Sequence, residues 1–258
     1  MRLSDVEHVG ASTAPRHGGR ILTIDIETSP HLCWSFSTFK TTISPDMIVE
    51  PSRILCFAAK WRDEKRMRFH SEHHDGREEM IRAARDLLDE ADIVVTYNGP
   101  GFDEKHLRRE FILAGLTPPS PWQSVDLLRT SRALFKFPSN RLGQVGQTLG
   151  IGSKVETGGW KLWRDVLAGD DKAWALFKKY CCGDVRLTEQ LLDVYAPWIK
   201  GMPHAGLWSR NRAACYSCGG TDLVPDGFAY TRVTRYPRLL CRCGAWNKVL
   251  MNGQTRAC

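Results

Sequence analysis

An apolar segment near the start of the chain carries two acidic residues on one face, which restricts how it can be buried. The segment ILTIDIET, residues 21–28, is rich in β-branched residues and is followed by Ser29-Pro30, so it predicts a β-strand. Side chains two positions apart share a face of a strand, so Asp25 and Glu27 project together while Ile24 and Ile26 point the other way. Because burying unpaired charge is costly, this pattern indicates either an exposed strand end or an acidic site.

A third acidic residue of interest follows another apolar strand. IVVTYN (93–98) is typical of a strand buried in a sheet centre, and a helix is predicted from about Asp103 to Ala114. An aspartate at a helix N-terminus is commonly a cap. However, α/β sheets also place their sites at the carboxyl ends of strands, so Asp103 fits both interpretations.

A fourth acidic residue interrupts the apolar face of a long predicted helix. The helix is expected from about Asp171 to Tyr195 and to end before Pro197. Tyr180 and Asp184 are four residues apart and therefore share one face, which also carries Phe177, Leu187 and Leu191. An acid within an apolar stripe is either a buried, paired residue or a ligand, and the sequence favours a ligand.

The four acids together predict a metal site. Asp25, Glu27, Asp103 and Asp184 cannot all stay ionised close together without compensating cations. Carboxylate oxygens suit Mg²⁺ or Mn²⁺ better than zinc. Two such ions about 3.5–4 Å apart can activate a water and stabilise the attacking and leaving oxygens of a phosphodiester.

The order of the elements indicates the fold class. Further strands are predicted at 54–61, 67–72 and 125–128, with helices at 77–91 and after a cap at Asn140. Strands alternating with helices predict an α/β domain, a mixed sheet with helices on both faces.

Residues 20–198 resemble the DEDD superfamily of 3′-5′ exonucleases, which have an RNase H-like fold. Its three motifs occur here in order as ILTIDIET, YNGPGFDEKHL and YCCGDV. The spacing Tyr180-x-x-x-Asp184, with Lys179 at the position that the other subclass fills with His, resembles the DEDDy subclass, which includes polymerase proofreading domains and RNase D. The residues of the three motifs look closest to those of the proofreading domains of B-family DNA polymerases.

The resemblance implies a role for each matching residue. Asp25, Glu27 and Asp184 would hold one Mg²⁺ or Mn²⁺, Asp25 would also contact the second, and Asp103 would act on the second ion directly or through water. Tyr180 would position the attacking water, because an unperturbed tyrosine pKa of about 10 makes it a poor base at neutral pH. Asn98 and Phe102 would help to place the 3′-terminal nucleotide, the aromatic ring by stacking.

A separate cysteine module is predicted at the C-terminal end. Cys215-x-x-Cys218 and Cys241-x-Cys243 are separated by 22 residues, which resembles a zinc ribbon with four thiolates on one structural Zn²⁺. The second pair departs from the usual C-x-x-C spacing. His204 is an outside candidate for a ligand, and the cluster of His70, His73, His74 and Asp75 is interpreted as a polar loop rather than a metal site.

The positive charge of the chain lies mostly in this module. The formal net charge is +7, and residues 201–258 carry eight Lys/Arg against Asp222 and Asp226. Aromatic and basic residues alternate in FAYTRVTRYPRLL, so Arg232, Arg235 and Arg238 are expected to bind nucleic acid and direct a 3′ end toward the acids. The alternative role for the ribbon is docking to a replication or repair protein, such as a polymerase or a single-strand-binding protein.

These expectations divide the chain into a flexible leader (1–19), an exonuclease domain (20–200) and a zinc ribbon with a basic tail (201–258). The predicted activity is hydrolysis of single-stranded DNA or frayed 3′ ends to nucleoside monophosphates. RNA 3′-end trimming, as by RNase D, and nucleic-acid binding without turnover are the alternatives. The sequence has no signal peptide or membrane-spanning stretch, which predicts a cytoplasmic protein of a bacterium or of a phage-infected host.

Overall fold

A computed structural model describes residues 19–39, 41–209 and 211–258. The predicted leader lies outside the described residues apart from Gly19. The chain divides into an N-terminal unit, Arg20–Pro203, and a C-terminal unit that contains His204–Cys258. None of the helices in the described ranges is long and apolar enough to cross a membrane.

The N-terminal unit is built on a five-stranded mixed sheet in the order β5-β4-β1-β6-β7. Its strands are β1 (Ile21–Thr28), β4 (Ile54–Trp61), β5 (Met67–Ser71), β6 (Ile93–Thr96) and β7 (Gln123–Asp126). β1 runs antiparallel to β4 and parallel to β6, and β6 runs parallel to β7. β1 is therefore the central strand, and its carboxyl end lies at the same edge of the sheet as those of β6 and β7.

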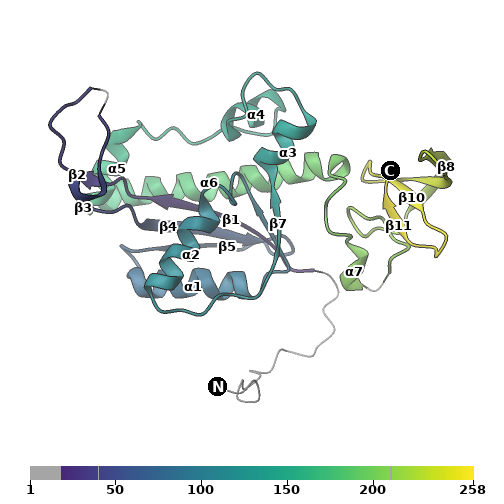
Figure 1. Ribbon diagram of the computed structural model, residues 1–258, viewed down its shortest axis with the longest axis horizontal. Helices are drawn as coiled ribbons and strands as arrows, with labels where there is room; N and C mark the ends of the chain where they lie inside the picture. Colours follow the sequence, from purple (N-terminus) through teal and green to yellow (C-terminus); the bar gives the residue numbers. More distant parts are fainter. Residues whose placement is uncertain (1–18, 40, 210) are drawn as a thin grey trace, which may run out of the picture. The chain divides into compact units, whose positions relative to one another are not determined.

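Helices cover both faces of this sheet (Figure 1), as predicted. They are α1 (Arg77–Asp89), α2 (Asp103–Leu113), α3 (Leu127–Leu134), α4 (Leu142–Thr148), α5 (Trp160–Leu167) and α6 (Asp171–Tyr195), followed by the 3-10 helix η3 (Ala196–Trp198). Ile24 and Ile26 of β1 pack in one core with α1 and α2, whereas α5 and α6 form a second core against β4. The alternation along β1 turns Asp25 and Glu27 toward α6, where Cys181 Sγ lies 3.6 Å from the carbonyl oxygen of Asp25.

Most predicted elements are confirmed, and two predictions need correction. α6 has the predicted bounds, and the carboxylate of Asp170 caps it by accepting from the Ala173 amide at 2.7 Å. The strand expected at 125–128 instead ends at Asp126, because the Asp126 side chain accepts from the Leu128 and Arg129 amides and starts α3. Asn140 does not cap α4; its side chain accepts a hydrogen bond from Ser131 Oγ at 3.0 Å.

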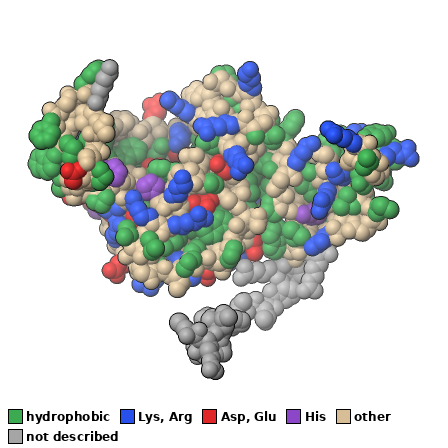
Figure 2. Space-filling model, in the orientation of Figure 1, with side chains coloured by type: hydrophobic (Ala, Val, Ile, Leu, Met, Phe, Trp, Pro, Cys, Tyr) green, Lys and Arg blue, Asp and Glu red, His purple; other side chains and the backbone are tan. Residues whose placement is uncertain are grey.

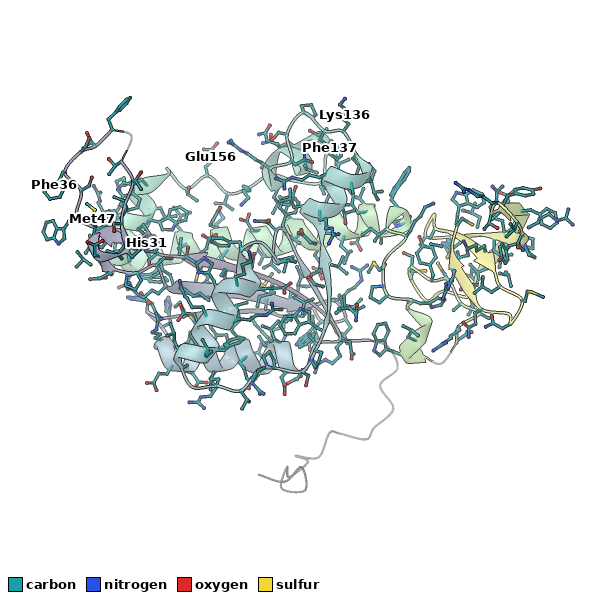
Figure 3. The ribbon with its side chains drawn as sticks, viewed as in Figure 1. His31, Phe36, Met47, Lys136, Phe137 and Glu156 are labelled. Carbon is teal, nitrogen blue, oxygen red and sulfur yellow. The ribbon has the colours of Figure 1, made fainter. Side chains whose placement is uncertain are left out.

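A hairpin that was not predicted follows β1. It consists of β2 (Leu32–Cys33), the 3-10 helix η2 (Pro45–Met47) and β3 (Ile48–Glu50). The side chains of Trp34, Phe36 and Phe39 are 75%, 101% and 78% exposed, so the apolar patterns that reveal buried strands are missing here. Figure 3 shows Phe36 and Met47 on this segment.

The C-terminal unit contains the short helix α7 (Gly206–Ser209) and a four-stranded antiparallel sheet in the order β11-β10-β9-β8. Its strands are β8 (Leu223–Tyr230), β9 (Arg235–Cys241), β10 (Trp246–Val249) and β11 (Thr255–Ala257). β8 and β9 form the hairpin expected between the two cysteine pairs. The small core of this unit includes Cys215, Tyr216, Cys241 and Ala245.

Candidate active site and zinc module

Three of the four predicted acids converge where β1 faces α6. Asp25, Glu27 and Asp184 each offer a carboxylate oxygen, and these atoms all lie within 4.8 Å of one another. Asp184 is only 2% exposed, because α6 packs its apolar face against β1 and β4. The two-residue period of the strand thus puts Asp25 and Glu27 on one face, and the packing of α6 brings Asp184 against that face.

Asp103, the fourth acid, is not part of this group of three carboxylates but contacts the backbone of β1 next to them. It is 4% exposed at the start of α2, and its Oδ1 accepts from the Ile26 amide at 3.2 Å. β1 pairs with β6 only through Thr23, so Ile26 lies beyond that ladder and its amide is open to a side-chain acceptor. The same contact places Asp103 beside the strand segment that carries Asp25 and Glu27.

The pKa values of all four carboxyls are raised, with burial as the largest cause in each case. Burial is the largest cause for Asp25, whose pKa is raised well above 3.8, and the charges of Asp103, Glu27 and Asp184 raise it further. Burial also raises the pKa of Glu27 to about 8, with the Asp184 charge adding to it, and the pKa of Asp103 to about 7. Acids of this kind are stabilised in their ionised form by a cation.

Divalent cations fit this donor set. Asp184 Oδ1 is buried and has no hydrogen-bond partner among the described residues, so it is open to a ligand. Hard carboxylate oxygens are the donors that Mg²⁺ and Mn²⁺ prefer. Asp25, Glu27 and Asp184 are positioned to hold one ion together, and Asp103 lies next to them through Ile26.

A lysine that the sequence analysis missed lies in the acidic cluster. Lys154 Nζ donates to Asp184 Oδ2 at 2.5 Å and to the Tyr180 hydroxyl at 3.1 Å. Burial disfavours its charged form, but the Asp184 charge and these hydrogen bonds outweigh burial and raise the pKa of Lys154. It comes from the loop between α4 and α5, which also carries Glu156, labelled in Figure 3. A single lysine in a glycine-containing loop gave no signal in the sequence.

Tyr180 lies one helical turn before Asp184 and is half-buried. Its ring packs edge-on against Trp163 at 6.1 Å between centroids, and Lys154 Nζ lies 5.0 Å from its ring centroid. Burial and the charges of Glu27 and Asp184 raise the pKa of Tyr180. The hydroxyl therefore stays protonated at neutral pH and can orient a water molecule but not remove its proton.

A cavity of about 600 Å³ opens beside the acids. Its lining residues are Asp25, Tyr97, Asn98, Leu128, Arg132, Asn140, Arg141, Leu142 and Lys154. A neighbouring cavity of about 410 Å³ shares Asn98, Leu128 and Arg132 with it and adds Arg129. The surface next to Asp25 thus carries a row of cations, which suits an anionic substrate.

The two residues predicted to place the terminal nucleotide lie differently. Asn98 lines both cavities, has a positive φ of 77° that asparagine tolerates better than most residues, and donates its amide to Asp126 at 2.9 Å. Phe102 is 39% exposed and packs against His106, with ring centroids 4.5 Å apart. It is not among the residues that line either cavity.

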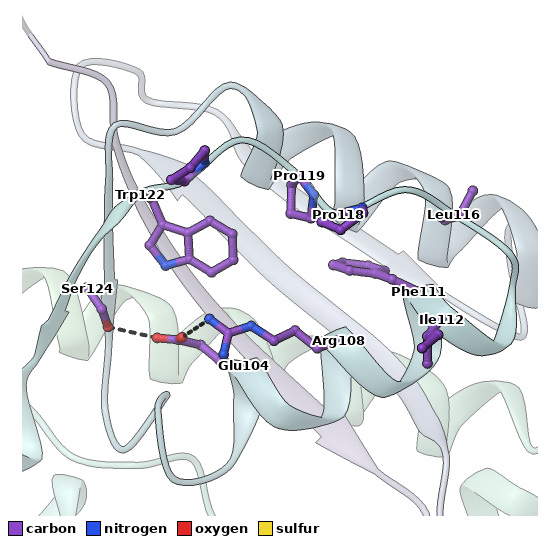
Figure 4. A pocket seen from close by; sticks show the side chains of 10 residues that line it. Glu104, Arg108, Phe111, Ile112, Leu116, Pro118, Pro119, Trp122 and Ser124 are labelled. Atoms are coloured by element: carbon purple, nitrogen blue, oxygen red, sulfur yellow. Dashed lines mark hydrogen bonds and ion pairs between the residues drawn. The ribbon is translucent and has the colours of Figure 1, made fainter. Parts of the chain in front are cut away.

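Another cavity, of about 570 Å³, lies between α2 and the proline-rich segment before β7 (Figure 4). Its walls are mostly apolar, including Phe111, Ile112 and Trp122. Its carboxylate, Glu104, accepts from Ser124 Oγ at 2.7 Å and from Arg108 at 2.9 Å. None of the predicted site residues lines this cavity, so it does not bear on the acidic cluster.

The four cysteines of the C-terminal unit have the spacing of a zinc site. Their Sγ atoms all lie within 4.8 Å of one another, with Cys215–Cys243 at 3.8 Å and Cys218–Cys241 at 3.6 Å. A tetrahedron with zinc–sulfur bonds of about 2.3 Å has edges of about 3.8 Å. Asn247 Nδ2 and the Gly220 amide donate to Cys215 Sγ and Cys218 Sγ at 3.5 Å and 3.4 Å, which favours thiolates. The donor set fits one Zn²⁺.

The histidines do not extend either metal site. His204 uses both ring nitrogens, Nε2 with Thr255 Oγ1 at 2.9 Å and Nδ1 as acceptor from the Gly206 amide at 2.9 Å. His73 stacks on Trp174 with centroids 5.0 Å apart, and His74 Nδ1 is bonded to Ser71 Oγ. Their contacts fit the interpretation of the 70–75 cluster as a polar loop.

The three arginines proposed to bind nucleic acid do not form one surface. Arg235 pairs with Tyr230 across the β8–β9 hairpin, and Arg232 lies in the turn of that hairpin. Arg238 is three residues from Arg235 on β9, so the two side chains leave opposite faces of the strand.

Comparison with known proteins identifies the family. A family model described as RNase_H_2, of the RNase_H superfamily, matches residues 49–196, more than half of the chain. The chain is structurally similar to the family B DNA polymerase from the hyperthermophilic archaeon Pyrobaculum calidifontis, with a TM-score of 0.54 and 18% sequence identity. The similarity covers 85% of this chain and 32% of the polymerase chain, so this chain spans about a third of that length. No curated protein matches. The chain belongs to the RNase_H superfamily, and its fold is RNase H-like.

Proposed function

We propose that this protein is a metal-dependent 3′-5′ exonuclease of the DEDDy type that hydrolyses single-stranded DNA or frayed 3′ ends to nucleoside monophosphates. Membership of the RNase_H superfamily supports a nuclease activity. The convergence of Asp25, Glu27 and Asp184 next to Asp103 carries the proposal, because a structural role does not require two half-buried and two buried acids together.

The acids have distinct roles in this proposal. Asp25, Glu27 and Asp184 would hold one Mg²⁺ or Mn²⁺. Asp25 would also contact the second ion, on which Asp103 would act directly or through water. When bound, the two cations supply Lewis-acid chemistry and neutralise the charge that develops on the phosphodiester. Without a cation, burial disfavours the ionised form of all four acids, and the charges of neighbouring site acids add to this for Asp25 and Glu27.

Tyr180 and Lys154 work as a pair. Tyr180 keeps its proton and orients the attacking water toward phosphorus, and Lys154 fixes the direction of the Tyr180 hydroxyl through its 3.1 Å hydrogen bond. The Lys154 ammonium also partly neutralises Asp184. Its third N–H remains available for a phosphate oxygen of the substrate.

The cations beside the acids support an extended anionic substrate. Arg132 and Arg141 line the cavity that contains Asp25 and Lys154, and Arg129 continues the row. Such a row contacts successive phosphates of a nucleic-acid strand. Asn98 lines both cavities and is suited to hydrogen-bond the terminal nucleotide.

The direct test follows a strand of about 20 nucleotides with a 5′ fluorescent label in Mg²⁺ or Mn²⁺. A 3′-5′ exonuclease gives a ladder of labelled products that shorten from the 3′ end, and it leaves a circular strand of the same sequence intact. Asp25→Ala and Asp184→Asn should abolish the ladder, whereas Asp165→Asn, at a partly exposed acid on α5 that pairs with Lys161, should leave it unchanged. Cleavage of the circle, or activity of both site variants, would contradict the proposal.

An RNA strand of the same sequence separates the alternatives. Faster shortening of RNA than of DNA would favour the RNase D-like activity over DNA hydrolysis. Binding of both strands without shortening in either metal would favour a nucleic-acid-binding protein without turnover.

A further inference from the structure

Three basic residues form a row across the sheet of the C-terminal unit. In the strand register, Arg238 of β9 lies directly opposite Lys248 of β10, and Lys248 lies directly opposite Arg256 of β11. Cross-strand partners share a face of the sheet, so the three side chains project together from neighbouring strands about 4.8 Å apart. The opposite face carries Asn247 and Cys241, which are buried against the cysteine core.

Aromatic side chains alternate with these cations on the same face. Trp246 is two residues from Lys248, and the Arg238 guanidinium carbon lies 4.3 Å from its ring centroid. Tyr236 is two residues from Arg238, and Lys248 Nζ lies 5.9 Å from its ring centroid. The Trp246 side chain remains 36% exposed. The face therefore offers cations and ring surfaces side by side.

Among the described residues, one of the three cations has an acidic partner. Arg238 forms an ion pair with the Asp226 carboxylate at 3.4 Å, and its Nε donates to the Asp226 carbonyl oxygen at 2.8 Å. In the described part of the chain, no acidic side chain forms an ion pair with Lys248 or Arg256. Like charges directly opposite one another destabilise a sheet, so this arrangement gains stability from an anionic ligand. Figure 2 shows basic side chains on the visible surface of this unit.

We propose that the face formed by Tyr236, Arg238, Trp246, Lys248 and Arg256 binds single-stranded nucleic acid. Lys248 and Arg256 contact phosphates, and the Trp246 ring stacks on an unpaired base. Bases inside a duplex are stacked on one another, so their faces are not accessible to the ring. The inference rests on the proposed function only in taking nucleic acid as the ligand. Because both units belong to one chain, a strand held here is tethered to the chain that carries the acids.

The test measures the affinity of the full-length protein for labelled single strands at several salt concentrations. Asp184→Asn is present in every protein, so that hydrolysis does not remove the ligand. Lys248→Gln together with Arg256→Gln should weaken binding about tenfold at near-physiological salt and reduce the slope of log affinity against log salt by about 1.4. DNA and RNA strands and a DNA duplex serve as separate ligands.

A matched control removes the same charge elsewhere in the unit. Arg212 and Arg242 are exposed and lie outside the strands, so Arg212→Gln with Arg242→Gln should leave the slope within experimental error. Lys248→Arg with Arg256→Lys keeps both charges and should bind like the parent protein. Zinc content and melting temperature, measured for each protein, identify a loss that comes from misfolding.

Three results would overturn the inference. They are an unchanged slope in the Lys248/Arg256 double variant, an equal loss in the Arg212/Arg242 control, and tighter binding of duplex than of single strands. Hydrolysis by wild-type protein is scored separately. A protein that binds strands through this face but does not shorten them would contradict the proposed exonuclease and leave this inference standing.

Discussion

At the scale of single residues, the acidic site contains a cation, Lys154, that the sequence did not reveal as a site residue. The acids were predictable because each one breaks a local pattern, such as the apolar stripe that Asp184 interrupts on α6. Lys154 breaks no pattern, and its position depends on how the loop after α4 packs on α6. Phe102 lies within the second motif, yet it is not among the residues that line the cavity beside Asp25. Its position in the motif was therefore not enough to predict contact with that cavity.

Replacing Lys154 tests its contribution to the reaction. Lys154→Met should lower kcat by about 10²-fold or more, because it removes the cation that pairs with Asp184 and orients Tyr180. Lys161→Met is the control, since Lys161 is exposed on α5 and forms its ion pair with Asp165. Initial rates on a labelled strand measure both. Equal rates in the two variants would remove Lys154 from the mechanism.

The carboxyl pKa values predict how Mg²⁺ stabilises the protein. Glu27 and Asp103 have folded pKa values of about 8 and about 7, against 4.5 and 3.8 when unperturbed. Because the folded state holds these protons more tightly, their contribution to stability is present at low pH and is lost as pH rises through 7–8. Mg²⁺ binds the ionised form, so it should raise the melting temperature more at about pH 9 than at about pH 6.

Thermal melts with and without Mg²⁺ measure this difference. Glu27→Gln removes the carboxyl with the pKa of about 8, so it should reduce the extra Mg²⁺ stabilisation at high pH and raise the melting temperature of the metal-free protein there. Equal Mg²⁺ shifts at both pH values in the wild-type protein would show that these acids do not take up the ion as ionised ligands.

At the scale of elements, sequence periodicity predicted the parts that are buried on one side. α6 has the predicted ends because its apolar stripe is long and Asp170 caps it. The sequence did not predict β2 and β3, whose residues are largely exposed and therefore carry no periodic pattern. The sequence did not predict α3, because the apolar residues Leu127 and Leu128 after Val125 suggested a continued strand. The Asp126 side chain instead caps a helix that begins at Leu127.

The loop that carries Lys154 depends on a glycine pair. Gly152 has a φ of +147°, which residues other than glycine rarely adopt. A Cβ added at Gly146 of α4 would lie 2.8 Å from the Gly152 carbonyl oxygen, so the two glycines allow a close approach. Gly152→Ala should therefore cost about 1–3 kcal/mol in the free energy of unfolding and displace Lys154, which lowers kcat. Denaturant unfolding and rate assays measure the two effects.

Gly201→Ala provides the matched control for this substitution. A Cβ at Gly201 meets no atom within 4 Å, and its backbone is not in the left-handed region. Its stability and rate should match those of the wild-type protein. A Gly152→Ala protein with wild-type stability and rate would show that the loop conformation does not position Lys154.

At the scale of the whole molecule, the two units differ in what stabilises them. Among the described residues, the N-terminal unit contains two large apolar clusters, whereas the cluster around the cysteines of the C-terminal unit is small. Such a small module takes much of its folding free energy from metal binding. Removing zinc should therefore unfold the C-terminal unit and leave Arg20–Pro203 folded.

Calorimetry and zinc analysis test this separation. Cys218→Ser should lower the zinc content from one ion per chain and abolish the transition of the C-terminal unit, while the transition of the N-terminal unit remains. Cys33→Ser, a cysteine outside the cluster, should keep one zinc per chain. Loss of both transitions in Cys218→Ser would show that the N-terminal unit needs the zinc module to fold.

The convergence of Asp25, Glu27 and Asp184 on a divalent cation is tested most directly by anomalous diffraction from crystals grown with Mn²⁺. We predict a manganese peak within about 2.0–2.5 Å of carboxylate oxygens from all three residues, with a second peak on the Asp25 and Asp103 side. A well-ordered site without manganese, with Asp184 still paired only to Lys154, would contradict the account.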